Sequence, residues 1–148
     1  MDGTGNSGAK RIVAYGMAAV FAAVGIIFLT APGGVIAFFN VLSGPLGMRP
    51  APVFAASLYS ALATAYMYLV TIFAWNMARR PEEDVFSRLL VQAKLASALI
   101  SFGLFATCRP YLILLANGII DGSIAAVVHF WFRRSGSAPR TGPGRPEA

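Results

Sequence analysis

"IVAYGMAAVFAAVGIIFL", residues 12–29, is a stretch of 18 residues that contains no charged side chain. An α-helix rises about 1.5 Å per residue, so a helix of this length just crosses a bilayer core that is about 30 Å thick. The stretch therefore predicts a membrane-spanning helix and indicates a membrane protein.

Three further apolar blocks follow, at 53–77, 89–108 and 111–132. Prolines stand near the block edges, where a proline begins or ends a helix without removing an interior hydrogen bond. Of the 148 residues, 57% are hydrophobic and 12% are charged, and the charged fraction is about half that of a soluble domain. The sequence therefore predicts an all-α, polytopic membrane protein in which four transmembrane helices form one bundle over 12–132.

The connection between the first two blocks contains a shorter apolar run of eight residues, Val35 to Leu42. Because this run is too short to span a bilayer, we expect an interfacial or shallow re-entrant segment. Its aromatic pair, Phe38 and Phe39, is expected to face lipid.

Basic residues predict the orientation of the bundle. Nine Lys and Arg residues lie in 1–11, 78–88 and 133–148, whereas the connections on the other side carry only Arg49 and Arg109. Cytoplasmic loops carry an excess of these residues, so both termini are expected in the cytoplasm and the bundle in the plasma membrane. The net charge of +6 then follows from topology and from attraction to anionic lipid, and no nucleic acid partner is needed.

The two ends of the chain are rich in Gly, Ser and Pro and poor in large apolar residues. Such segments cannot bury enough apolar surface to offset the entropy lost on ordering. We therefore expect disordered cytoplasmic tails over 1–11 and 133–148.

Two charged residues lie inside the predicted spans, Lys94 in the third and Asp121 in the fourth. A charge at the bilayer centre costs about 2.5–3.5 kcal/mol on insertion scales, so each needs a partner. A very short turn joins these spans, which makes them antiparallel neighbours and favours an ion pair. However, each side chain leans toward the N-terminus of its own helix, and the two therefore lean apart. Lys94 can reach back, or it can snorkel to the headgroups while Asp121 finds other donors.

Other polar residues stand at similar depth in the second, third and fourth spans. The candidate intramembrane polar site consists of Asp121, Lys94, Asn117, Tyr66, Tyr68, Ser97 and Ser101. Two interpretations stay open at this point. The residues either hydrogen-bond only to fix helix packing, or they line a proton, ion or small-ligand site.

Sequence motifs for catalysis and metal binding are absent. The chain has no phosphate-binding glycine loop, no cluster of Cys and His residues, and no Ser, His and Asp residues at the spacing of a known hydrolase. No catalytic residue and no metal site is therefore predicted. The single cysteine, Cys108, excludes an intrachain disulfide. The single histidine, His129, is interpreted as an interfacial residue beside Trp131, with a quinone or haem contact as the alternative. No cofactor is therefore predicted, and quinone or haem remains the alternative.

Small residues recur every four positions along three of the spans, and such stripes let helices approach closely in a bilayer. They are Ala19 and Ala23 in the first span, Ser57, Ala61 and Ala65 in the second, and Gly118, Gly122 and Ala126 in the fourth. We expect these stripes to mark helix contacts.

The layout of the chain resembles a known group of proteins. "FLTAPGGVIAFF", "YSALATAYMYL", "VQAKLASALI" and "NGIIDGSIAAVV" follow one another in that order, with a basic loop between the second and third spans. This arrangement over 12–132 resembles small four-helix bacterial membrane proteins of the DoxX-like kind. The resemblance implies a bacterial membrane protein, and some members of that group are described as subunits of quinone-linked sulfur oxidation systems. It carries no redox-site residue over to this chain.

The sequence as a whole favours a non-enzymatic membrane or accessory subunit of a larger complex. Its expected partners are the lipid bilayer and either another membrane protein or a second copy of the chain. One alternative is a quinone-linked oxidoreductase subunit that uses Tyr66, Tyr68, Lys94 and Asp121. The other is a small transporter or proton-coupled channel.

Overall fold

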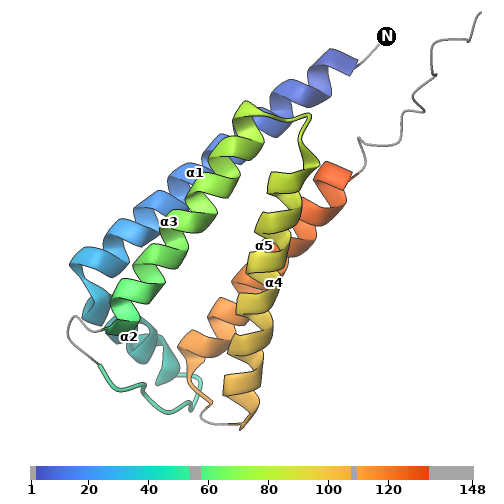
Figure 1. Cartoon of the computed structure of the whole chain (residues 1–148). Coiled ribbons are helices and arrows are strands. Elements are labelled where there is room, and N and C mark those ends of the chain that lie inside the picture. The colour runs from blue at the N-terminus through green and yellow to red at the C-terminus, as the bar shows by residue number, and fades with distance from the viewer. Residues whose placement is uncertain (1–2, 54–57, 108–109, 134–148) are drawn as a thin grey trace, which may run out of the picture.

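Five helices make up the part of the chain that the computed structural model describes, residues 3–53, 58–107 and 110–133. They are α1 (Gly3–Thr30), α2 (Pro32–Ser43), α3 (Leu58–Arg79), α4 (Asp84–Thr107) and α5 (Leu112–Arg133). All but α2 are long and apolar enough to cross a membrane (Figure 1). The predicted all-α bundle with four membrane-spanning helices is therefore confirmed, and the protein is a multi-pass membrane protein.

Two of the spanning helices begin earlier than the sequence predicted. α1 begins at Gly3, so the prediction of a disordered tail over 1–11 is wrong for residues 3–11. Tertiary contact explains the difference, because Lys10 is buried and its ammonium lies 5.6 Å from the centre of the Phe132 ring. α4 begins at Asp84 rather than at residue 89, and the carboxylate in its first turn stabilises the positive end of the helix dipole.

Apart from the start of the second span, the remaining described ends of the spanning helices lie within two residues of the predicted ones. Val53, the predicted start of the second span, is not helical, and residues 54–57 lie outside the described ranges. Arg133 ends α5 instead of beginning a tail. The rest of the predicted C-terminal tail lies outside the described residues, as do Cys108 and Arg109.

The spanning helices form two antiparallel pairs. α1 packs along α3, α4 packs along α5, and α3 and α4 make most of the contact between the pairs (Figure 1). The buried core gathers toward the end of the bundle where α3 passes into α4. It consists of Ala14, Ala18, Phe21, Met67, Val70, Ala74, Met77, Ala78, Leu90, Val128 and Phe132.

The close contact between α1 and α3 uses a different set of small residues from the predicted one. Ala14, Ala18 and Gly25 of α1 are buried, whereas Ala19 and Ala23 are exposed. The described members of the predicted α3 stripe are exposed as well. Successive residues on a helix are rotated by about 100°, so moving the contact by one position turns a predicted interface toward lipid.

α2 is the short apolar segment that the sequence predicted between the first two spans. It has 12 residues, which extend about 18 Å and cannot cross the bilayer core. It is separate from α1 because Ala31, the residue before Pro32, leaves the helical conformation. Phe38 is exposed but Phe39 is half-buried, so the expectation that the two rings share a lipid-facing side is wrong.

A loop returns from α2 toward α3 across the same end of the bundle. Asn40 fixes this loop with two hydrogen bonds to Ala51: its Nδ2 donates to the carbonyl oxygen, and its Oδ1 accepts from the backbone N–H, both at 2.7 Å. α2 also contacts α1 and α5. α2 therefore connects the two helix pairs at the end of the bundle opposite the N-terminus (Figure 1).

Candidate functional site

The two intramembrane charges form a direct ion pair between α4 and α5. Lys94 Nζ donates a hydrogen bond to Asp121 Oδ1 at 2.7 Å. The side chains are only 3% and 5% exposed. The lysine side chain is long enough to bridge the offset that separates the two positions along the helices, and it does not snorkel to the headgroups.

Two aromatic rings complete the surroundings of the Lys94 ammonium. Its Nζ lies 4.7 Å from the centre of the Phe21 ring of α1 and 5.1 Å from that of the Tyr66 ring of α3. The negative face of an aromatic ring attracts a cation, and the attraction is stronger where water is excluded. Lys94 therefore contacts a side chain from each of the other three spanning helices. Phe21 was not predictable from the sequence, because an apolar residue in an apolar span carries no distinguishing signal.

Small residues on α5 let its backbone approach α4, so that the Lys94 side chain reaches Asp121. A Cβ atom at Gly122 would lie 3.8 Å from the Cβ of Ala98, and one at Gly118 would lie 2.9 Å from the Phe102 ring. These positions flank Asp121 along the sequence, so the α5 backbone lies close to α4 at the level of the carboxylate. The predicted small-residue stripe is therefore a helix contact at Gly118 and Gly122.

A second polar cluster joins the same two helices. Asn117 Nδ2 donates hydrogen bonds to Ser101 Oγ at 2.8 Å and to Ser97 Oγ at 3.3 Å. Ser101 is buried, whereas Asn117 is exposed. The cluster therefore presents a hydrogen-bonding amide on the outside of the α4–α5 pair.

The two predicted tyrosines have different environments. Tyr66 is half-buried, and its hydroxyl donates to the carbonyl oxygen of Ala93 at 3.0 Å, which connects α3 to α4. Tyr68 is 69% exposed, so its placement in the polar interior is wrong. Residues two positions apart lie about 200° apart around a helix, and both cannot face the same interior.

The ion pair is buried, and the polar groups around it have hydrogen-bond partners. Within the described ranges, no buried side-chain nitrogen or oxygen lacks a hydrogen-bond partner. Among the surface hollows of the described residues, three are lined by residues of α1, α3, α4 and α5, and neither Lys94 nor Asp121 lines any of these three. A ligand that approached the pair from the α1–α3 side would have to displace Phe21 or Tyr66. As arranged, the pair neutralises two charges and connects helices.

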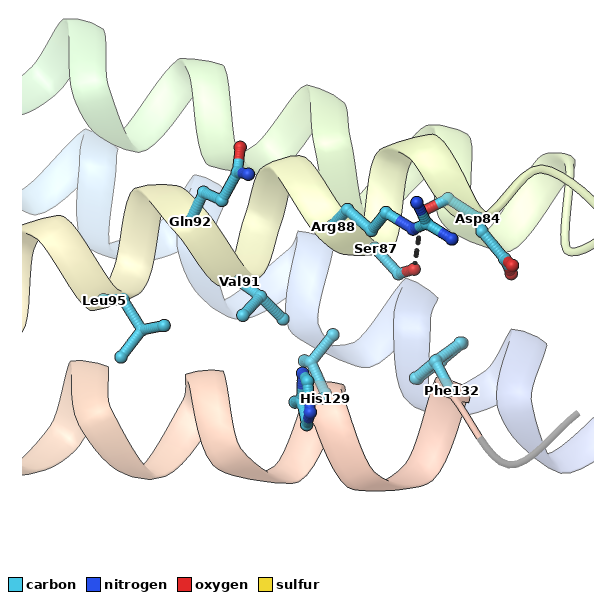
Figure 2. A pocket seen from close by; sticks show the side chains of 9 residues that line it. Asp84, Ser87, Arg88, Val91, Gln92, Leu95, His129 and Phe132 are labelled. Carbon is cyan, nitrogen blue, oxygen red and sulfur yellow. Dashed lines mark hydrogen bonds between the residues drawn. The ribbon is translucent and has the colours of Figure 1, made fainter. Parts of the chain in front are cut away.

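His129 lies apart from the ion pair, in a groove between α4 and α5. The groove has a volume of about 420 Å³, and His129 is half-buried in it. Figure 2 shows Val91 and Leu95 pointing from α4 toward α5, with Ser87 and Arg88 nearer the start of α4. This groove was not among the predicted sites, although the spacing of Ser87, Val91 and Leu95 by four residues marks one face of α4.

Metal-binding side chains do not gather anywhere in residues 3–53, 58–107 and 110–133: no group of three or more His, Cys, Asp or Glu residues is found there. Comparisons with protein-family models, with curated proteins and with solved structures give no match for this chain.

Proposed function

We propose that this protein is a non-enzymatic subunit of a larger membrane complex and that its intramembrane ion pair has a structural role. The observation that carries the proposal is the closure of the site. Lys94 and Asp121 bind each other, and Phe21 and Tyr66 cover the ammonium. A carboxylate that moves protons or holds a substrate needs access to water or to a ligand, whereas a structural one needs only a partner.

The proposed location is the bacterial plasma membrane, with both termini in the cytoplasm. Nine Lys and Arg residues lie in the tails and connection placed in the cytoplasm, and two lie in the connections on the other side, which supports this orientation. The layout that resembles DoxX-like proteins supports a role as a subunit. The cytoplasmic end of the bundle is then the end at which α3 passes into α4.

Reporter fusions test this orientation. Fusions after Arg134 and within 79–88 are expected to behave as cytoplasmic, and a fusion near Arg49 as external, because basic loops resist translocation. The measurement is the activity of a reporter pair, one enzyme active only in the cytoplasm and one only outside it. Outside activity at Arg134 would overturn the proposed orientation.

The proposed contact with the partner lies at Asn117. This carboxamide is exposed at bilayer depth while it hydrogen-bonds to Ser97 and Ser101. Polar side chains at that depth join helices through hydrogen bonds, and lipid tails offer none. We therefore place a membrane helix of the partner, with a hydrogen-bonding side chain at matching depth, against Asn117.

Site-specific photocrosslinking tests the partner contact in intact membranes. A photoreactive residue at position 117 is expected to form one protein adduct of defined mass, whereas the same residue at Phe130 should form only lipid adducts. Phe130 is a matched control because it is exposed on the same helix, and it lies about 220° around the helix from Asn117. Asn117→Leu should also reduce recovery of the same partner when the protein is purified under mild conditions.

Several outcomes would overturn the proposal. If the photoreactive residue at position 117 formed only lipid adducts, no partner protein would lie against Asn117. An adduct with a second copy of this chain would replace the accessory role with a homo-oligomer. A quinone or haem that purifies with the protein in stoichiometric amount would favour the oxidoreductase alternative, and substrate-dependent flux in vesicles would favour the transporter.

A further inference from the structure

The groove between α4 and α5 combines a polar end with an apolar wall. Ser87, Arg88 and His129 supply hydrogen-bonding groups, and Val91 and Leu95 supply apolar surface (Figure 2). Its volume of about 420 Å³ lies within the range of about 300–1,000 Å³ that is usual for small-molecule sites. The groove therefore suits an amphipathic ligand.

Arg88 is the positively charged residue that lines this groove. It is exposed, and within the described residues no hydrogen bond or ion pair joins it to another side chain. Asp84, one turn earlier on α4, lines the same groove and forms no ion pair with Arg88. A guanidinium binds phosphate oxygens through two parallel hydrogen bonds, so a phosphate group is the partner that matches Arg88.

The position of the groove along the bundle identifies the source of the phosphate. The α4 residues that line it run from Asp84 to Leu95, a distance of about 16 Å along the helix axis. The groove therefore extends from the end of the helix, where headgroups lie, into the depth of the acyl chains. Leu95, at the deep end, is 45% exposed and apolar. A free phosphate would leave this apolar wall uncovered, whereas a phospholipid covers both parts.

We propose that the groove between α4 and α5 binds one anionic phospholipid, with its phosphate against Arg88 and an acyl chain along Val91 and Leu95. An anionic lipid is favoured over a zwitterionic one because basic residues concentrate at this end of the bundle, although the Asp84 carboxylate in the groove would attract the ammonium of a zwitterionic headgroup. The Ser87 hydroxyl already donates to the carbonyl oxygen of Asp84 at 2.8 Å, so Arg88 is the donor that meets the phosphate. The inference does not depend on the accessory role, since it requires only that the bundle lies in a bilayer.

Native mass spectrometry of the full chain tests the site. The protein is reconstituted with equimolar phosphatidylglycerol and phosphatidylcholine of identical acyl chains, and the retained lipid is counted. One phosphatidylglycerol per chain is expected. Arg88→Gln should reduce its retention by about tenfold, the usual effect of losing a charge-assisted hydrogen bond. Asp84→Asn should increase retention, because it removes the carboxylate that repels the phosphate.

Matched variants separate this site from a general basic surface. Arg79→Gln removes an exposed arginine at the same end of the bundle but outside the groove, and it should leave retention unchanged. Leu95→Gln should weaken retention by removing the acyl contact. The midpoint of thermal unfolding of each variant should match that of the wild type. A match would show that a variant retains less lipid although it is still folded.

Three results would overturn the inference. Equal retention of the two lipids would show that the headgroup charge does not matter. Equal effects of Arg79→Gln and Arg88→Gln on lipid retention would show that the lipid does not bind in the groove. Full displacement of the lipid by millimolar inorganic phosphate, with no effect of Leu95→Gln, would assign the site to free phosphate instead of lipid.

Discussion

Asp121→Asn is expected to destabilise the folded protein by about 3–5 kcal/mol, the range for breaking a buried ion pair by removing one partner. The substitution leaves the Lys94 ammonium between Phe21 and Tyr66 with no counter-charge, and both pair members are nearly inaccessible in the folded protein. The asparagine oxygen can still accept a hydrogen bond but cannot neutralise the charge. Equilibrium unfolding in mixed detergent micelles, followed by helical circular dichroism, measures this loss.

The double variant provides the more specific result. Lys94→Met alone should also destabilise, because it leaves the Asp121 carboxylate buried without a cation. Lys94→Met combined with Asp121→Asn removes both charges, so the double variant should lose less stability than the sum of the two single variants. The expected difference is several kcal/mol, which exceeds the error of the measurement.

An exposed ion pair in the same chain is the control for this cycle. Arg80 and Glu83 are joined at 3.3 Å in the turn before α4, and their side chains are 61% and 47% exposed. Arg80→Gln, Glu83→Gln and their combination should change stability by less than about 1 kcal/mol in total, because water screens the pair.

Two outcomes of the cycle would contradict the structural role. Additivity within about 0.5 kcal/mol would show that Lys94 and Asp121 are not coupled, as expected if the lysine snorkels. Unchanged stability combined with loss of a measured flux or redox activity would show that the carboxylate serves chemistry, and the transporter or quinone alternative would then replace the accessory role.

Gly25→Leu is expected to be the next most damaging substitution, with a loss of about 2–3 kcal/mol from overpacking. A Cβ atom at Gly25 would lie 3.1 Å from the Cβ of Met67, which is closer than ordinary van der Waals contact. The Met67 Cβ is bonded directly to the α3 backbone and cannot swing away. Any larger side chain therefore pushes α1 from α3, and the same unfolding measurement reports it. Gly25→Ala should show a smaller loss, because a single methyl requires a shift of only a few tenths of an ångström.

Gly16 on the same helix is the matched control. It is exposed, and a Cβ there would meet nothing within 4 Å. Gly16→Leu should therefore be neutral or slightly stabilising, because leucine favours a helix more than glycine does. Equal losses at Gly16 and Gly25 would point to a general effect of leucine on α1. No loss at Gly25 would contradict the close approach of α1 and α3.

Much of the fold and the presence of two intramembrane charges were predictable from the sequence. The apolar length of a segment is a local property, and a bilayer of fixed thickness converts it directly into a spanning helix. A charge inside such a segment is equally visible, so Lys94 and Asp121 stand out without any knowledge of their surroundings. The short turn between their helices made them neighbours, although their opposed leanings left the direct contact open.

Only the tertiary structure decided which face of each helix meets the others. A helix in a soluble protein shows its interior side by an alternation of apolar and polar residues, whereas a membrane helix is apolar toward both lipid and protein. For that reason Tyr68 was placed inside beside Tyr66, and Ala19 was placed at a contact that Ala18 makes. The same absence of contrast concealed Phe21, whose ring covers Lys94. The sequence determined the number of spans and the depth of the charges. The rotation of the helices, which packing and interhelical polar contacts set together, determined what surrounds those charges.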